Sequence, residues 1–311
     1  MSKEKINTCQ VNREGKQFFA GYCETQLMDK KCGVTFPMSI MYPTDQEGKM
    51  EAIGPFQLDV SINAKPIEEK VPLVLISHGS GGGNLLYRTI AHYLARNGFV
   101  VGMPEHPFNN FNNNTLEGTV ENLKNRPRHI NIAMDWFFEH EIFSRVIKED
   151  SISIIGHSTG GCTALSVAGG IPTSLPNEAS DGRPRQIKVE HNRRIKSLVL
   201  LAPGTVWFKE KGALDGVDIP ILMLAAEKDQ FILPSQNQIV VDGVADSSKV
   251  EYRIVENAGH FSFLSPFPEF MISPDFFPAL DPVGFDRQKF HEELNLEILN
   301  FLMKVNAPIN L

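Results

Sequence analysis

Short apolar runs of strand length recur along this chain, and most of them are continuous rather than alternating. Runs of four to eight apolar residues without a polar face are typical of strands that are buried on both sides, as in a parallel sheet. The clearest of them are Val71–Ser77, Phe99–Met103, Ile152–Ile155, Ile195–Ala202 and Ile219–Ala226. These runs predict the centre of one sheet.

A different pattern precedes them. In Val34–Met41, apolar residues alternate with smaller or polar ones, which predicts a half-buried strand. We expect Phe18–Cys23 to pair with it through a polar turn around residues 29–31. Residues 45–70 are rich in Gly, Pro and charge, and we expect them to form a long surface connection. Val250–Val255 predicts a last strand.

Segments with helical spacing alternate with these runs. They are Leu85–Arg96, Pro127–His140, the small-residue segment up to Ala168, Pro234–Val244 and Phe285–Val305. Strands that alternate with helices predict an α/β fold with a mostly parallel, doubly wound sheet and helices on both faces. In such sheets, ligands bind beyond the carboxyl ends of the strands.

The 311 residues, 42% hydrophobic and 22% charged, fit one globular domain. We find no repeat or linker, and we expect a single domain over residues 1–311. Three irregular stretches, at about 104–126, 171–194 and 261–282, read as insertions near the site.

Charge and composition exclude several classes of function. The net charge of −7 argues against nucleic acid or an anionic membrane as the main partner. No apolar stretch is long enough to span a membrane, and the polar N-terminus has no signal-peptide pattern, so we expect a cytoplasmic protein. The spacing of the cysteines, Cys9, Cys23, Cys32 and Cys162, fits no metal site. We expect reduced thiols, although Cys23 and Cys32 are close enough in sequence to pair under oxidising conditions.

The strongest chemical motif is Gly156–Gly161, reading GHSTGG, between a predicted strand and a predicted helix. A serine in a sharp strand-to-helix turn needs small residues on either side, and Gly156 and Gly160 supply them. The positive end of the following helix favours negative charge that develops beside the serine. Ser158 is therefore a candidate nucleophile, and a glycine-rich helix cap is the alternative.

A serine hydroxyl needs a base, and the base needs an acid that orients it. His260 follows the last predicted strand, within Asn257–Phe261, and is the candidate base. Asp229 follows the strand that ends at Ala226 and is the candidate acid, with Glu227 as its competitor. The resulting order Ser, Asp, His is the one expected for this architecture.

The reaction also needs donors for an oxyanion, each of which typically contributes about 2.7–4 kcal/mol. One candidate is the N–H of Thr159 at the start of the helix. The second is the N–H of Ser80, in the glycine-rich loop after Val71–Ser77. The sequence lacks the spacing of a phosphate-binding or dinucleotide-binding loop, so we expect no cofactor. His78 and His157 are expected to pack or to form hydrogen bonds.

These motifs resemble the α/β-hydrolase superfamily, and more narrowly the dienelactone-hydrolase-like group that includes platelet-activating-factor acetylhydrolases. The resemblance covers roughly residues 19–305 and is carried by Met41–Thr44, Ser77–Gly79, Pro104–Pro107, Arg126–Pro127, Gly156–Ser158 and Gly259–Phe261.

The resemblance implies that Ser158 is the nucleophile, His260 the base and Asp229 the acid, with the N–H groups of Ser80 and Thr159 as the oxyanion hole. Plasma acetylhydrolases place their acid one strand earlier, where this chain has Leu201–Thr205 and no carboxylate. Dienelactone hydrolases use a cysteine nucleophile. The resemblance therefore does not imply that this chain acts on the substrate of either group.

We expect a carboxylic ester of short to medium chain as the substrate. Cleavage of an amide or a thioester, for instance in a peptide-like or specialised metabolite, uses the same residues and stays open. A non-catalytic receptor or scaffold is the alternative from another class. Several aromatic residues fall in loops near strand ends, where they are candidates to line an apolar pocket: Phe108, Phe111, Trp207, Phe208, Phe231, Phe261, Phe263 and Phe267.

Overall fold

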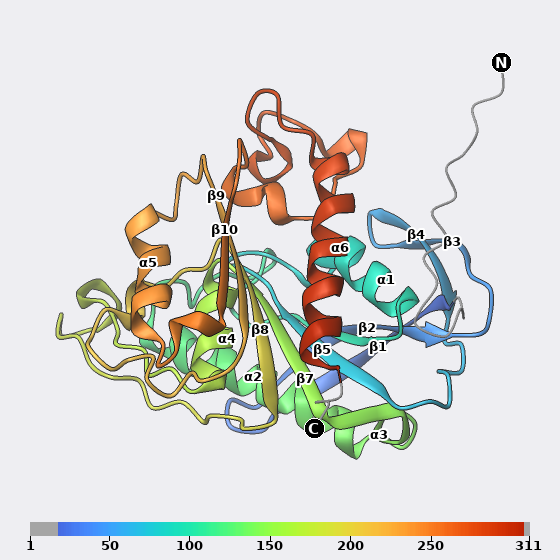
Figure 1. The fold of residues 1–311 in the computed structure, drawn as a ribbon, viewed down its shortest axis with the longest axis horizontal. Coiled ribbons are helices and arrows are strands. Elements are labelled where there is room, and N and C mark those ends of the chain that lie inside the picture. Colours follow the sequence, from blue (N-terminus) through green and yellow to red (C-terminus); the bar gives the residue numbers. More distant parts are fainter. Residues whose placement is uncertain (1–17, 308–311) are drawn as a thin grey trace.

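A computed structural model, which describes residues 18–307, arranges the strands in one ten-stranded sheet (Figure 1). The order across the sheet is β10-β9-β8-β7-β5-β6-β2-β1-β4-β3. The strands are β1 (Phe19–Asp29), β2 (Val34–Thr44), β3 (Lys49–Ile53), β4 (Phe56–Ile62), β5 (Val71–Ser77), β6 (Val100–Pro104), β7 (Ile147–His157), β8 (Ile195–Leu201), β9 (Ile221–Ala226) and β10 (Val250–Val255). The six strands from β10 to β6 run parallel, and β2 is antiparallel to β6.

Helices cover both faces of the sheet. They are α1 (Arg88–Arg96), α2 (Val120–Glu139), α3 (Phe143–Val146), α4 (Thr159–Ala168), α5 (Pro234–Gly243) and α6 (Arg287–Val305). Side chains of α2, α4 and α5 belong to the apolar cluster on one face, and those of α1 and α6 to the cluster on the other. Figure 1 shows α1 beside α6 across the central strands. The predicted doubly wound α/β architecture is confirmed.

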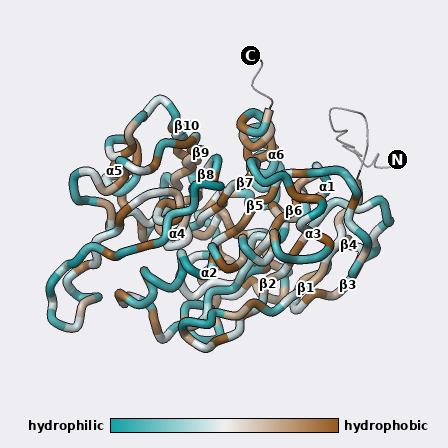
Figure 2. Tube along the Cα trace, turned by 90° about the horizontal axis from the view of Figure 1, so that it is seen from below, coloured by the Kyte–Doolittle hydropathy of each residue, from teal (hydrophilic) through white to brown (hydrophobic). Residues whose placement is uncertain are grey.

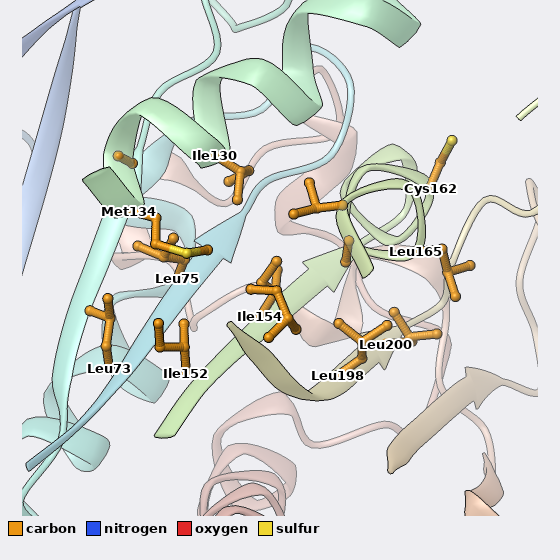
Figure 3. Close-up of a cluster of buried hydrophobic side chains, with 14 of the residues drawn as sticks. Leu73, Leu75, Ile130, Met134, Ile152, Ile154, Cys162, Leu165, Leu198 and Leu200 are labelled. Atoms are coloured by element: carbon orange, nitrogen blue, oxygen red, sulfur yellow. The ribbon is translucent and has the colours of Figure 1, made fainter. Parts of the chain in front are cut away.

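The central strands are buried on both faces because successive side chains point to opposite sides. In β5, Leu73 and Leu75 join the cluster under α2 and α4, whereas Val74 and Ile76 join the cluster under α1 and α6. Figure 3 shows side chains of α2 and α4 facing those of β5, β7 and β8. Figure 2 shows the hydrophobic stretches concentrated in these interior elements. The uninterrupted apolar runs of the sequence are therefore explained.

Two expectations about irregular segments are wrong. Residues 45–70 do not form only a surface connection, because β3 and β4 make a hairpin and β4 pairs with β1. In β4, Phe56, Leu58 and Val60 are buried and alternate with polar residues, a period of two that the charged flanks obscured.

The stretch 104–126 is also not all loop. Helix α2 begins at Val120, and the side chain of Thr119 accepts a hydrogen bond from the N–H of Asn122, which caps it. Pro127 thus lies inside the helix, although a proline usually marks the first helical turn. The stretches 171–194 and 261–282 are irregular with short 3₁₀ turns, as expected.

The cysteines within residues 18–307 carry free thiols, on Cys23, Cys32 and Cys162. Cys9 and the polar N-terminal segment lie outside the described residues. In the part of the chain that the structure describes, no helix is long and apolar enough to cross a membrane.

Candidate active site

Ser158 occupies the turn between β7 and α4, at the carboxyl end of the sheet. Its φ of 54° and ψ of −122° lie in a region that costs a residue with a side chain free energy. A Cβ on Gly160 would lie 1.9 Å from the carbonyl oxygen of Ser77, and one on Gly156 would lie 2.3 Å from that of Gly160. The glycines therefore permit the close approach of strand and helix that holds the serine in this strained turn.

Asp229 and His260 come from turns 31 residues apart and are in direct contact. Nδ1 of His260 lies 2.8 Å from Oδ2 of Asp229, and the two side chains are 4% and 3% exposed, respectively. The other carboxylate oxygen accepts hydrogen bonds of 2.8 Å from the N–H groups of Phe231 and Ile232. With Nδ1–H donated to the carboxylate, Nε2 is the nitrogen that remains to accept a proton.

The electrostatics of this pair keep the acid ionised. Burial raises the pKa of Asp229, but the hydrogen bond and charge of His260 and the two backbone donors outweigh burial and hold that pKa below its usual range. Glu227, the competing acid, instead accepts a hydrogen bond of 2.7 Å from the N–H of Asn257. Among the two carboxylates, Asp229 is the one that the structure brings to His260.

His157 links the serine turn to the histidine turn. Its Nε2 lies 3.0 Å from the carbonyl oxygen of His260, so this nitrogen carries the proton, and Nδ1 accepts from the hydroxyl of Tyr87 at 2.9 Å. That hydroxyl accepts from the N–H of Gly79 at 3.3 Å. Burial lowers the pKa of His157 to about 3, which keeps the ring neutral. The expectation of a hydrogen-bonding role for His157 is confirmed.

The loop after β5 lies against the serine. A Cβ on Gly79 would lie 3.2 Å from the Cβ of Ser158. The next residue, Ser80, donates from Oγ to Oε1 of Glu117 at 2.8 Å and accepts from Nδ2 of Asn109 at 2.8 Å. The side chain of Ser80 is thus held by partners, and its N–H donates to no group within residues 18–307.

Thr159 is the first residue of α4, so its N–H is one of the helix amides that have no partner within the helix. The structure therefore brings the turn of Ser158, the first turn of α4 and the loop of Ser80 together at one edge of the sheet. His78, in the same loop, is buried, and its Nδ1 bonds the carbonyl of Gly79 at 2.7 Å.

Five of the eight candidate aromatic residues divide into two groups. Phe231 is 53% exposed, with its ring centroid 5.0 Å from that of His260, and Phe261 packs against both rings. In contrast, Phe208, Phe263 and Phe267 are buried. These three residues belong to the core and not to an accessible pocket wall, because the elements after strand ends fold back over the sheet.

The sequence pattern did not reveal the polar support of the loop of Ser80. Arg126 is 1% exposed and donates a hydrogen bond of 2.5 Å to the side chain of Asn109. An arginine is seldom fully buried, and the sequence marks Arg126 only as part of an Arg-Pro motif. Within residues 18–307, no group of three or more His, Cys, Asp or Glu side chains is arranged to hold a metal ion.

Comparison with known proteins identifies the fold. The family described as "Platelet-activating factor acetylhydrolase, isoform II" matches residues 46–115, a stretch that contains the loop of Ser80 but not Ser158, Asp229 or His260. A search of curated proteins finds no significant match.

Solved structures match over nearly the whole chain. A ferulic acid esterase from Streptomyces cinnamoneus is 16% identical with a TM-score of 0.66, and the match covers 94% of each chain. A dienelactone-hydrolase-like promiscuous phosphotriesterase from metagenomic libraries is 13% identical with a TM-score of 0.56, covering 92% of this chain and 99% of the other. The chain therefore has the α/β-hydrolase fold, and its resemblance to the dienelactone-hydrolase and acetylhydrolase group is confirmed. By their names, one of these matched structures is an esterase and the other a dienelactone-hydrolase-like phosphotriesterase.

Proposed function

We propose that this α/β-hydrolase-fold protein is a serine hydrolase that cleaves a carboxylic ester, with Ser158 as nucleophile, His260 as base and Asp229 as acid. The observation that carries the proposal is the buried pair of Asp229 and His260. It leaves Nε2 of the histidine as the proton acceptor at the sheet edge where the strained turn presents Ser158. A binding role alone requires neither the pair nor the strain.

In this mechanism, Oγ of Ser158 attacks the ester carbonyl carbon while Nε2 of His260 takes the hydroxyl proton. The negative charge on the former carbonyl oxygen is stabilised by the N–H groups of Ser80 and Thr159. The C–O bond to the alcohol then breaks, and His260 returns its proton to the leaving oxygen. Water, deprotonated by the same nitrogen, attacks the acyl-enzyme. The bond between the acyl carbon and Oγ then breaks, His260 returns the proton to Oγ of Ser158, and the carboxylic acid is released.

The surroundings of His260 favour an apolar group in the substrate. The exposed Phe231 and the half-buried Phe261 form an aromatic border beside the imidazole, and burial of apolar surface contributes about 25 cal/mol per Å². We therefore propose an ester with an apolar acyl or alcohol part. A cytoplasmic location is part of the proposal, in keeping with the free thiols of Cys23, Cys32 and Cys162.

The test is turnover of p-nitrophenyl esters from acetate to decanoate by the wild-type chain, Ser158→Ala and Ser151→Ala. Ser151 lies in β7, the strand that leads to the candidate nucleophile, seven residues before it, and is the matched control. We expect turnover by the wild type and the control and its loss in Ser158→Ala. The chain-length optimum then measures the size of the apolar site.

Equal turnover by Ser158→Ala would contradict the assignment. Turnover of matched thioesters or anilides, but not of esters, would favour the alternative amidase or thioesterase. The absence of any turnover, together with no reaction of Ser158 with a fluorophosphonate, would favour a receptor or scaffold.

A further inference from the structure

Arg126 lies fully buried in α2, behind the loop of Ser80, and uses its guanidinium as a four-way donor. Nε donates to Oγ1 of Thr163 at 3.0 Å, and Nη1 donates to Oδ1 of Asn109 at 2.5 Å. Nη2 donates to the carbonyl oxygen of His78 and, at 3.4 Å, to Oγ of Ser77. The planar guanidinium fixes the relative position of these acceptors, which belong to α4, the loop after β6, and the end of β5 with its loop.

Three of these four contacts lead to one of the two proposed oxyanion donors. Oγ1 of Thr163 donates to the carbonyl oxygen of Thr159 at 3.1 Å. Nδ2 of Asn109 donates to Oγ of Ser80 at 2.8 Å, and the carbonyl of His78 lies two residues before Ser80 in the same loop. One guanidinium therefore braces both the helix start and the loop that form the proposed hole.

The positive charge of Arg126 has no counterion among the described residues, since no carboxylate within residues 18–307 forms an ion pair with it. Burial lowers its pKa to about 9, so the group stays charged at neutral pH. The rings beside it are neutral, because burial lowers the pKa of His78 to about 3 and holds that of His106 well below its usual value.

The hydrogen-bonded network reaches two carboxylates, but only through intervening groups. Glu117 is reached through Asn109 and Ser80, and Asp29 is reached through Ser77 and two histidine rings. Nδ1 of His106 lies 3.3 Å from Nδ1 of His129, whose Nε2 lies 3.4 Å from Oδ2 of Asp29. That same oxygen already pairs with Arg128 at 2.6 Å. A buried cation without a counterion costs free energy, and a role near a site that develops negative charge would account for its presence.

We propose that Arg126 is the positioning residue of the oxyanion hole: it holds the loops of Ser80 and Thr159 in register and adds a buried positive charge behind them. The inference rests on the proposed function and extends it. Because the guanidinium is buried, its charge acts on the developing oxyanion with less screening than a solvent-exposed charge would. The guanidinium does not touch the substrate, so its effect is expected on the transition state and not on substrate binding.

The first test compares Arg126→Met and Arg126→Lys with the wild type on p-nitrophenyl acetate. We expect Arg126→Met to lower kcat by about tenfold or more, below the roughly 10²–10³-fold that follows loss of a direct donor, with KM unchanged. Affinity for a trifluoromethyl ketone, which forms an oxyanion on Ser158, should fall by the same factor. Arg126→Lys keeps the positive charge but loses the planar set of donors, and we expect its kcat to lie between those of the wild type and Arg126→Met.

Removal of a buried arginine can prevent folding, so a milder pair carries the positioning part of the test. Thr163→Val removes the acceptor of Nε and the bond to Thr159 with little change in volume, whereas Thr163→Ser keeps the hydroxyl. We expect Thr163→Val to lower kcat at unchanged KM and Thr163→Ser to restore most of it. A purely structural role would lower the melting temperature of Thr163→Val without this split.

The charge is tested separately at Asn109. Asn109→Asp and Asn109→Ala both lose the amide donor to Ser80, but only the aspartate gives Arg126 a counterion. We expect Asn109→Asp to lower kcat further than Asn109→Ala. An equal or higher kcat for Asn109→Asp would contradict the electrostatic part of the inference.

The two proposals fail in different ways. If folded Arg126→Met and Thr163→Val retain the wild-type kcat, or if their losses lie entirely in KM, the inference about Arg126 is wrong and the esterase proposal stands. If the wild-type chain itself neither turns over esters nor binds the trifluoromethyl ketone, the proposed function fails, and the inference fails with it.

Discussion

The two halves of the candidate site are held in place in different ways. In the base half, the carboxylate of Asp229 is fixed by N–H groups two and three residues further along its own turn, and the exposed ring of Phe231 borders the histidine. In the oxyanion half, the loop of Ser80 is held by side chains from distant parts of the chain, and Arg126 is buried among them. One half depends on local turns, and the other depends on a buried polar network.

This difference predicts how each half responds to perturbation. Local turns keep their shape when a single side chain changes, so substitutions in the base half should affect chemistry more than folding. A buried network loses hydrogen bonds at several positions together, so substitutions there should affect stability as well. The predictions that follow test this contrast, beginning with the largest effect.

Asp229→Asn should lower kcat by about 10⁴-fold, because an amide cannot hold His260 in the tautomer that leaves Nε2 free to accept a proton. Turnover of p-nitrophenyl acetate measures the effect. Glu227→Gln, two residues away, is the matched control and should stay near the wild-type value. Equal losses in both variants would show that the turn, and not the acid, matters.

Acid should destabilise the protein because buried histidines in the core of the site are held neutral. The pKa values of His78 and His157 are lowered by burial to about 3, whereas an unfolded histidine titrates near 6.5. The unfolded chain therefore binds more protons below pH 6.5. The contribution of these histidines to the free energy of unfolding is fully present above that pH. Below it, the free energy of unfolding falls by up to about 1.4 kcal/mol per pH unit for each such histidine.

Urea unfolding between pH 7.5 and pH 5 measures this slope. His106→Asn removes one of the neutral rings and should flatten the slope, whereas replacement of the exposed His191 by Gln should leave it unchanged. A wild-type unfolding free energy that is constant over this range would contradict the buried network.

Asp29→Asn should destabilise the fold at pH 7 by about 1–3 kcal/mol, since its carboxylate pairs with the partly exposed Arg128 and with His129. Hydrogen bonding to His129 and Arg128 holds the pKa of Asp29 far below its usual range. A lowered pKa stabilises the fold above the unfolded value of about 3.9, and this contribution is lost as the pH falls below it.

The difference between wild type and Asp29→Asn in urea unfolding should therefore shrink below about pH 4. A difference that stays constant down to pH 3 would show that the ionised carboxylate and its partners do not account for it.

The smallest effect is expected at the aromatic border. Phe231→Ala should raise KM for the p-nitrophenyl decanoate by a few-fold and change KM for the acetate less, because only the longer chain reaches the exposed ring. Ile142→Ala is the control, since Ile142 is equally exposed but precedes β7 at the opposite end of the strand. A uniform change across all chain lengths would place Phe231 outside the substrate path.

The proximity of Asp229 and His260 could be predicted from the sequence, whereas the support of the loop of Ser80 could not. Asp229 and His260 each follow a recognisable strand within a few residues, so the known topology of parallel sheets is enough to bring them to one edge. Ser158 is similarly marked by its glycines. The hairpin of β3 and β4 was missed because charged flanks hid a short alternating pattern in Phe56–Val60.

The hydrogen bonds that support the loop of Ser80 could not be predicted for a different reason. Arg126, Asn109 and Asp29 are polar residues whose burial depends on contacts between α2, the loop after β6 and the end of β1. Neither hydropathy nor spacing indicates that a particular arginine or asparagine will be buried. Only the three-dimensional arrangement of these segments shows it.

The most direct test of the account is to identify the residue that reacts with a fluorophosphonate. The wild-type chain would be labelled, digested and analysed by mass spectrometry, with Ser158→Ala and Asp229→Asn treated in parallel. We predict a single adduct on Ser158, no adduct in Ser158→Ala and much slower labelling in Asp229→Asn. The absence of labelling, or labelling at another serine such as Ser80, would contradict the assignment of Ser158 as nucleophile.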